Sequence, residues 1–469
     1  MDLRKAITKI TPSLLEMRRD FHRYPELAFQ EVRTSAKLAD FLQGLGLEVT
    51  RGVAKTGVVA RLRGARAGKT ILVRADMDAL PIQEASGLEY SSQIPGVMHA
   101  CGHDGHAAIA AHVAAVLLPF KDQIAGEVRF VFQPAEEIVS GAKPMVEAGV
   151  LEGVDAVVGL HLYSLMPVGR VGVRAGPSMA AADAFTIELT GKGAHAAMPH
   201  EGVDTVLMAA QLIVALQSLV SRETDPLQSA VITIATVTAG KGAHNIIPET
   251  ATLKGTLRTF DAGLRERLMW RISELSKGIA AAMGGRVSVA WLPGSPAVVN
   301  DPQMVERFRR VARQVLGEDA VLEVPPVMGG DDMAEFLCRR PGVYFWLGAG
   351  HPDLAKNRPH HHPAFWIDDS RALPLGGRTH CSHCTGFFGL VGNAVLNCFE
   401  QCPGQQQTAS TPGQGTHPVG ANQHGMSLWV EPCCQLCMEW HRYKSGCDPD
   451  HKKQGQSQPA HPDWQARGP

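Results

Sequence analysis

A short segment of this chain crowds together side chains that bind metals and transfer protons. Between Met98 and His106 the sequence M-H-A-C-G-H-D-G-H holds three histidines, one cysteine and one aspartate. Cys101 and His103 flank Gly102, and a glycine lets both neighbours face one point in a turn without steric cost. A thiolate and an imidazole so placed suit a borderline-soft divalent metal. The segment therefore predicts a metal site rather than a histidine-rich surface loop, because further candidate ligands follow later in the chain.

Apolar strands before and after this segment are expected to end in side chains that bind metal or move protons. The strand Lys69–Asp76 contains the continuous run Ile71-Leu72-Val73, which is typical of a strand buried on both faces. Open α/β sheets place their ligands at the carboxyl ends of strands, where Asp76 lies. We therefore predict a functional role for Asp76 and leave the nearby Asp78 undecided, since a loop carboxylate can also cap a turn.

A pair of glutamates follows the next apolar strand. Val128–Gln133 is stopped by Pro134, and Glu136 and Glu137 come directly afterwards. Neighbouring side chains diverge in an extended segment, so one can bind a metal while the other contacts water. Metal-assisted hydrolysis requires such a division between a ligand and a general base. Glutamate pairs are common on surfaces, but the preceding apolar strand favours function here.

Histidines follow two further apolar strands. Asp155–Leu162 runs into His161, and the strand Val343–Gly348 is followed by the triplet 360–362. A single histidine at such a place is often a hydrogen-bonded core residue. Because both strands, like the two earlier ones, lead into a possible metal ligand, we predict His161 and one member of the triplet as metal ligands.

Residues 179–292 have a different expected order of strands and helices, which predicts an inserted ferredoxin-like α+β domain. The expected order is β-α-β-β-α-β, the order of a split βαβ unit. Its elements are expected at Asp183–Thr190, Thr205–Arg222, Ala230–Ala239, Ala251–Phe260, Ala262–Met283 and Arg286–Leu292. His195, Asn245 and Arg258 are polar groups of this region that could reach a substrate, although ordinary turn residues remain an alternative.

Composition limits the classes of partner and the number of domains. A chain of 469 residues is long enough for two or three domains, and its formal net charge of −1 gives no reason to expect nucleic acid or anionic membrane as a partner. The start has no long apolar segment. Cys101 and Cys338 are the only cysteines before residue 380, so the body is expected to be cytoplasmic, whereas the cysteine-rich end differs from it.

In this order, the motifs resemble a metal-dependent amidohydrolase family that includes hippurate hydrolases, aminoacylases and indole-acetyl-amino-acid hydrolases and is related to metallo-carboxypeptidases. The similarity runs from about residue 12 to Leu375. The matching motifs are Arg74-Ala-Asp-Met-Asp-Ala-Leu-Pro, His99-Ala-Cys-Gly-His-Asp-Gly-His, Gln133-Pro-Ala-Glu-Glu, Gly159-Leu-His, Gly191-Lys-Gly-Ala-His-Ala-Ala-Met-Pro and Asn245-Ile-Ile-Pro.

The resemblance implies an α/β catalytic domain with a mixed sheet and two divalent metal ions per chain. The implied metal ligands are Cys101, His103, Glu137, His161 and His361, with His362 as the fallback for the last. Glu136 would be the general base and Asp76 would support the metal centre. His195 would assist the oxyanion, in its own or a partner's site, while Asn245 and Arg258 would hold the substrate carboxylate. A cysteine ligand favours zinc, with manganese, cobalt or nickel as alternatives.

The expected reaction is hydrolysis of N-acyl amino acids, hippurate-like or N-acetyl, to a carboxylic acid and an amino acid. The resemblance also implies a homodimer through residues 179–292. Three alternatives remain: a dipeptidase or carboxypeptidase on the same site, a hydrolase with Cys101 as nucleophile activated by His103 or His106, and a binding protein that has lost catalysis.

The last alternative arises from the C-terminal sequence. We expect a catalytic domain from residues 1–178 and 293–376, followed by an atypical tail, 377–469, that is largely disordered, above all beyond about residue 403. The sequence from Gly377 departs from the family pattern, as if the terminal helix had been replaced by a change of reading frame, and Gly386–Phe399 is the only stretch apolar enough to dock in its place. A zinc site on Cys381, Cys384, Cys398 and Cys402 is disfavoured because the surroundings are of low complexity.

Overall fold

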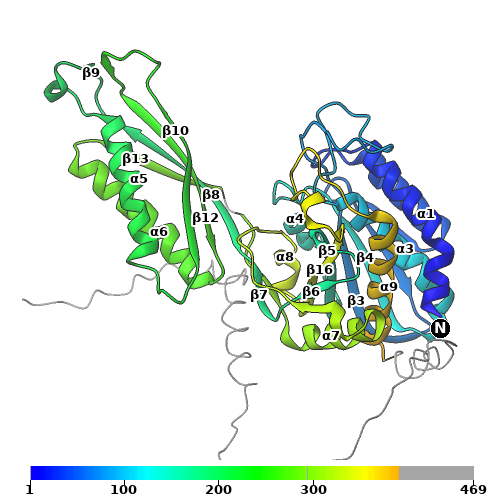
Figure 1. The fold of residues 1–469 in the computed structure, drawn as a ribbon. Coiled ribbons are helices and arrows are strands. Elements are labelled where there is room, and N and C mark those ends of the chain that lie inside the picture. Colours follow the sequence, from blue (N-terminus) through cyan, green and yellow to red (C-terminus); the bar gives the residue numbers. More distant parts are fainter. Residues whose placement is uncertain (1, 293, 390–469) are drawn as a thin grey trace, which may run out of the picture.

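A computed structural model describes residues 2–292 and 294–389, which form a large mixed sheet with its helices and a smaller α+β unit beside it (Figure 1). This arrangement confirms the expected fold class. No helix within the described residues is both long enough and apolar enough to cross a membrane.

The large sheet has eight strands in the order β1-β2-β4-β3-β5-β16-β6-β15. Its four central strands, β4, β3, β5 and β16, are parallel, so their carboxyl ends meet at one edge. The strand bounds are β1 (Glu48–Val53), β2 (Gly57–Arg63), β3 (Arg66–Asp76), β4 (Ala125–Gln133), β5 (Ala156–Pro167), β6 (Val171–Val173), β15 (Val321–Glu323) and β16 (Gly342–Gly350). This edge is where the sequence places most of its candidate ligands.

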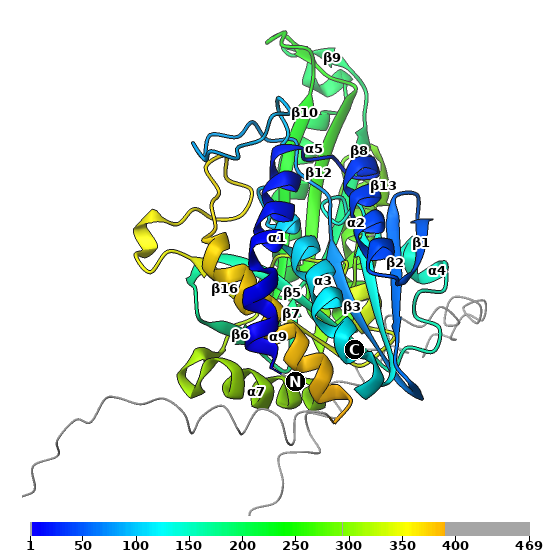
Figure 2. The ribbon, with the colours of Figure 1, turned by 90° about the vertical axis from the view of Figure 1, so that its right-hand side faces the viewer.

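Both faces of the large sheet are covered. Ile71 and Val73 pack into one apolar cluster and Leu72 into another, as expected for a strand buried on both sides. The helices α1, α3 and α9 lie side by side over one face (Figure 2), and α4 and α8 contribute to the cluster on the other. The helix bounds are α1 (Leu3–Arg23), α2 (Val32–Gly44), α3 (His103–Leu117), α4 (Ala142–Glu147), α7 (Pro302–Leu316), α8 (Ala334–Leu337) and α9 (Asp369–Phe387).

The smaller unit has the predicted β-α-β-β-α-β order. Its elements are β8 (Ala181–Thr190), α5 (Thr205–Ser221), β10 (Ala230–Ala239), β12 (Thr250–Thr259), α6 (Ala262–Ala282) and β13 (Arg286–Leu292). The strands form an antiparallel sheet in the order β10-β12-β8-β13, and α5 and α6 pack on it through one apolar cluster. Two further antiparallel sheets have two short strands each. They pair β9 (Ala194–His195) with β11 (Ile246–Ile247) and β7 (Gly176–Met179) with β14 (Val298–Asn300).

The helix α9 corrects our expectation for the end of the catalytic domain. It runs from Asp369 to Phe387, across the boundary expected at residue 376, and packs against α1, α3 and α7. The expectation that only Gly386–Phe399 could dock in this place was therefore wrong. The sequence looked unsuitable because it is rich in glycine, cysteine and histidine, but these side chains are small or can be neutral when buried. A Cβ on Gly376 would lie 2.7 Å from Leu347, so glycine allows a close approach of the helix to the sheet.

Cys381 and Cys384 are free thiols buried in the core on α9. The remaining members of the disfavoured zinc site, Cys398 and Cys402, lie outside the described residues, as does the tail expected to be disordered beyond residue 403.

Two buried histidines of α9 predict that the protein loses stability in acid. His380 and His383 have no hydrogen-bond partner among the described residues, and burial lowers the pKa of each to about 3. Below pH 6.5 the unfolded chain binds protons at both residues, whereas the folded protein does not until near pH 3. The free energy of unfolding should therefore fall through this window, by about 2 kcal/mol per histidine at pH 5.

The measurement is denaturant unfolding at pH 7.5 and at pH 5.0, for the unsubstituted protein and for a variant with His380→Leu and His383→Leu. The variant should lose clearly less stability between the two pH values. An equal loss in both proteins would contradict the assignment.

Candidate metal centre

The candidate ligands converge at the carboxyl edge of the large sheet. Asp76 ends β3 directly beside Gln133, the last residue of β4, and Glu136 and Glu137 follow β4 by three and four residues. His161 lies on β5, and the start of α3 supplies Cys101 and His103. Gly102 begins that helix with a left-handed backbone, φ +93°, which confirms the turn expected from the sequence.

One group of ligands consists of Cys101, His103 and Glu137, whose donor atoms lie within 4.8 Å of one another. The Nδ1 atom of His103 lies 3.0 Å from the backbone oxygen of Asp78, so this nitrogen donates and Nε2 keeps its lone pair. His103 Nε2 and Glu137 Oε1 are buried 3.8 Å apart, and neither has a hydrogen-bond partner within the described part of the chain. Two orphaned buried acceptors beside a thiol fit a divalent cation.

Asp78, which the sequence left undecided, holds two of these ligands. Its Oδ1 lies 3.2 Å from His103 Nδ1, and its Oδ2 accepts a hydrogen bond of 3.0 Å from the backbone of Glu137. Carboxylates that orient metal-binding histidines in this way are a recurrent feature of metal sites. The sequence signal was the D-M-D spacing after β3, which put a second carboxylate on the same edge.

A second group consists of Cys101, His161 and His360, again with donor atoms within 4.8 Å of one another. Nδ1 of His161 donates to the backbone oxygen of Leu162 at 2.8 Å, and Nε2 lies 3.5 Å from the sulfur of Cys101. The two groups share Cys101, so the arrangement offers donors for two neighbouring metal ions.

The triplet contributes more than one histidine to this region. His361 Nε2 lies 3.3 Å from Glu137 Oε2, so this histidine adjoins the first group, and its role as a metal ligand stays a prediction. His361 also has a positive φ of 63°, as does Ala135 before the glutamate pair at 54°, and such strained backbone is frequent at functional sites. The ring of His362 accepts a hydrogen bond from the backbone of Ala364 instead. His360, which the sequence did not single out, joins the second group.

Asp76 and His106 form a supporting pair rather than a metal site. His106 Nδ1 lies 2.6 Å from Asp76 Oδ1, and its Nε2 accepts a hydrogen bond of 2.8 Å from the backbone of Leu162. With both ring nitrogens engaged, His106 has no lone pair left for a metal. Burial favours a neutral Asp76, but His103, Arg74 and His106 outweigh it and hold the pKa of Asp76 well below its usual value.

Glu136 lies in a buried cluster of carboxylates. Its side chain and those of Asp331 and Asp332 approach within 4.8 Å of one another. Arg74 compensates part of this charge through ion pairs of 3.2 Å with Asp331 and 3.0 Å with Asp332. Burial, together with Asp331 and Asp332, raises the pKa of Glu136 well above its ordinary value. A carboxyl group that binds protons this readily suits a residue that takes up and returns one.

The buried thiol of Cys101 argues against its use as a nucleophile. Cys101 is 7% exposed, and burial, followed by the negative charge of Glu137, raises its pKa well above the ordinary value. A nucleophilic cysteine needs the opposite shift, toward the thiolate at neutral pH. Contact with a metal cation would remove this obstacle, because a coordinating thiol loses its proton.

A buried charge cluster behind the ligands predicts a large effect of Arg18. The Arg18 guanidinium lies 2.9 Å from Asp104, the residue after His103, and donates to Asp369 at 3.1 Å. Arg18→Met should lower the free energy of unfolding by about 3–5 kcal/mol, because the buried carboxylate of Asp104 loses its guanidinium partner, whereas Asp369 keeps its ion pair with Arg19 at 2.9 Å. Arg51→Met, which breaks an exposed pair with Asp40, should cost less than about 1 kcal/mol. Denaturant unfolding of both variants is the measurement, and equal effects would contradict the prediction.

The three candidate residues of the smaller unit do not lie together. His195 and Asn245 are exposed neighbours on β9 and just before β11, joined by a hydrogen bond of 3.0 Å from Ala196 to the oxygen of Asn245. They lie at the end of this unit that points away from the large sheet (Figure 1). Arg258 lies at the other end of β12, where a Cβ on Gly330 would be 3.4 Å from its Nη1. Of the three residues, only Arg258 lies near the candidate site within one chain, because Gly330 precedes Asp331 of the carboxylate cluster.

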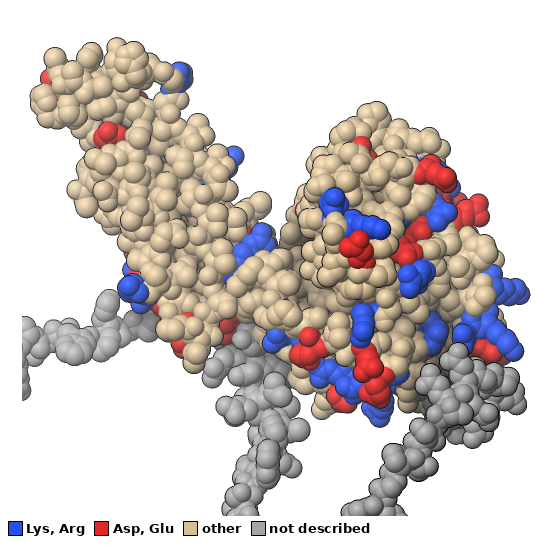
Figure 3. Space-filling view, viewed as in Figure 1, with Lys and Arg blue, Asp and Glu red and all other residues tan. Residues whose placement is uncertain are grey.

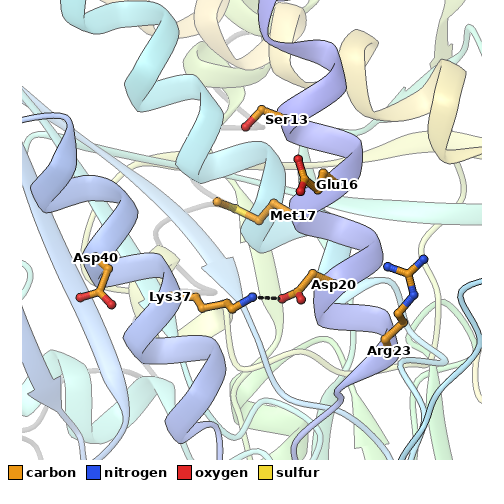
Figure 4. A pocket seen from close by; sticks show the side chains of 7 residues that line it. All are labelled: Ser13, Glu16, Met17, Asp20, Arg23, Lys37 and Asp40. Carbon is orange, nitrogen blue, oxygen red and sulfur yellow. Dashed lines mark hydrogen bonds and ion pairs between the residues drawn. The ribbon is translucent and has the colours of Figure 1, made fainter.

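A groove of about 340 Å³ between α1 and α2 is separate from these ligands (Figure 4). It is lined by Ser13, Glu16, Met17, Asp20, Arg23, Lys37 and Asp40. Lys37 and Asp20 form an ion pair of 2.7 Å across it. None of the lining residues belongs to either ligand group, so the groove is not part of the candidate site.

Comparisons with known proteins show the family of the chain. The model of the family described as "Peptidase family M20/M25/M40" matches residues 72–375. "Thermostable carboxypeptidase 1" of Saccharolobus solfataricus is 39% identical over 382 residues, which cover 81% of this chain and 96% of that protein. "N-acetyl-L-cysteine deacetylase" of Bacillus subtilis is 40% identical over 368 residues, covering 78% and 86%. Among solved structures, the Bacillus subtilis YXEP protein, described as "a Dinuclear Metal Binding Peptidase from M20 Family", superimposes with a TM-score of 0.71 at 36% identity, covering 82% of this chain and all of that one.

Proposed function

Because this hydrolase belongs to peptidase family M20/M25/M40, we propose that it cleaves the amide bond of N-acyl amino acids and releases a carboxylic acid and an amino acid. One observation carries the proposal. Two orphaned acceptors, His103 Nε2 and Glu137 Oε1, meet beside Cys101, and Glu136, a carboxyl group with a raised pKa, lies next to them.

Cys101, His103, Glu137, His161 and His361 are the proposed metal ligands. Two divalent ions held there would polarise the scissile carbonyl and lower the pKa of the attacking water. The shared thiolate favours zinc, whereas manganese, cobalt and nickel remain alternatives. We also propose a cytoplasmic location, because the body of the chain uses few cysteines, with Cys101 and Cys338 the only two before residue 380.

In the proposed mechanism, Glu136 moves the proton. Its carboxylate accepts a proton from the attacking water and passes it to the nitrogen of the leaving amine. Asp331, Asp332 and Arg74 set the charge around Glu136, and Asp76 and Asp78 hold the histidines behind the site. These contacts keep the base and the ligands in place while the proton moves.

The substrate carboxylate is proposed to bind Arg258. This side chain is half-buried beside Gly330, and burial lowers its pKa; its Nε donates to Thr256 at 3.1 Å, which leaves the outer edge of the guanidinium for an anion. Asn245 is proposed as its partner, and His195 as a donor to the oxyanion. His195 Nδ1 accepts a hydrogen bond from Ala197, so Nε2 carries the proton that such a donor needs.

His195 and Asn245 would have to come from a second copy of the chain, because they point away from their own site. We therefore propose that residues 179–292 form a lid and dimerisation domain between the two catalytic segments, 1–178 and 293–376. The face of this region in Figure 3 carries few charged side chains. Leu207 and Val214, which lie about two turns apart on the same face of α5, are 51% and 71% exposed, and Trp270 on α6 is 60% exposed.

A dipeptidase or carboxypeptidase on the same site is the second candidate, since a carboxypeptidase is among the relatives. A substrate screen separates the two functions. Purified protein with added zinc or manganese should release amino acid from N-acetyl or N-benzoyl amino acids faster than from dipeptides. Faster cleavage of dipeptides would favour the peptidase. If metal-loaded protein cleaves none of these substrates, the remaining alternative is a binding protein that has lost catalysis.

A further inference from the structure

His360 has the surroundings of a metal ligand. It is partly buried, and its donor atom lies within 4.8 Å of those of Cys101 and His161. The ring centroids of His161 and His360 lie 4.9 Å apart at an angle of 35°, so the two imidazoles are direct neighbours. In the family that the sequence resembles, the last metal ligand stands two residues before a proline, and this position is His361 here. The family motif therefore does not require a histidine at position 360.

The hydrogen bonds of His360 fix which of its nitrogens is available. The backbone oxygen of Leu162 accepts from Nδ1 of His161 at 2.8 Å and from Nε2 of His360 at 3.0 Å. Metal-binding histidines usually donate their second ring N–H to a carbonyl or a carboxylate in this way. The pattern leaves the lone pair on Nε2 of His161 and on Nδ1 of His360. His103, held through Nδ1 by Asp78, follows the same rule.

We propose that His360 is an additional metal ligand, which binds through Nδ1 beside Cys101 and His161. The triplet then serves both ions, with His361 on the side of Glu137 and His360 on the side of His161. This inference rests on the proposed two-metal hydrolase and goes beyond it, because it assigns a ligand that the family motif does not require.

The proposal predicts different preferences for the two ions. A thiolate with two imidazoles is a soft donor set, which suits zinc, cobalt or nickel. The other group contains the Glu137 carboxylate and tolerates a harder ion such as manganese. One ion should therefore be released by chelators more slowly than the other when zinc is bound.

The test is a metal titration of the full chain, with one matched set of variants. Metal-free protein is titrated with Zn²⁺ against a chromophoric chelator and with Co²⁺ by absorption. His360→Ala and His360→Gln should each weaken one of the two ions by about tenfold or more and change the Co²⁺ spectrum, since even supporting partners cost about 10–100-fold. His362→Ala, which alters the neighbouring histidine, should leave both affinities unchanged.

The glutamine variant separates a ligand from a mere hydrogen-bond donor. Its amide can still donate to Leu162, so unchanged affinity in His360→Gln together with loss in His360→Ala would overturn the proposal. Unchanged affinity in both variants would also overturn it. Cys101→Ala in the same titration tests the centre itself: if that variant keeps both ions, the proposed function fails as well. If His360→Ala does not fold by circular dichroism, the glutamine variant alone decides.

Discussion

Glu136→Gln is expected to keep its metal content and to lose turnover by about 10²–10⁴-fold, the usual contribution of a positioned base. Glutamine keeps the size of the side chain and can still form hydrogen bonds, but it cannot accept the proton of water. Substrate affinity should change little, because the lost interaction belongs mainly to the transition state. Metal stoichiometry and steady-state kinetics on an N-acyl amino acid are the measurements.

Glu137→Gln is the matched comparison. Its Oε1 is the orphaned atom beside His103, so a neutral amide there should weaken metal binding. If Glu136→Gln loses metal while Glu137→Gln keeps it, the two roles are exchanged. If both variants keep metal and full activity, the active site lies elsewhere.

Cys101→Ala is expected to have the second large effect. Cys101 is the one side chain common to both ligand groups, so its loss should remove at least one ion and disturb the other. Turnover should fall by more than the 10–100-fold that supporting partners of a metal site typically contribute. The measurements are metal analysis by mass spectrometry and turnover on the same samples.

Cys338→Ala is the control for Cys101→Ala, because Cys338 follows α8 outside the site and its sulfur faces the backbone of Glu335. This variant should keep its metal and its activity. Unchanged metal content in Cys101→Ala would remove Cys101 from the ligand set and reopen the case for a thiol nucleophile.

The sequence predicted the fold and the convergence of several candidate ligands, for a simple physical reason. Parallel strands buried on both faces are continuous apolar runs, and their carboxyl ends share one edge. The residues that end or follow these runs, such as Asp76, Glu137 and His161, therefore had to meet. The alternation of strands and helices in 179–292 was equally clear, and two of its strands have the predicted bounds.

The parts that sequence reasoning missed or left undecided depend on side-chain contacts. Asp78 and His360 look like loop residues in the sequence, and only their hydrogen bonds to His103 and Leu162 give them a place in the site. The helix α9 was missed because its buried face beyond Leu373 is made of small, polar and histidine side chains rather than of leucine and valine.

The placement of His195 and Asn245 also depends on tertiary structure. Sequence motifs brought them together with Arg258, but one end of a ten-residue strand carries Arg258 and the loops beyond the other end carry the pair. This separation within one chain is the reason for proposing that a second copy supplies His195 and Asn245.

The most direct test of the account is to remove and restore the metal while activity is followed. Protein is stripped with a chelator, reloaded stepwise with zinc, and assayed at each step for bound metal and for hydrolysis of an N-acyl amino acid. We expect activity to disappear with the metal and to return as the ions bind, reaching its maximum near two per chain. Full activity in protein that contains no metal would contradict the proposed mechanism.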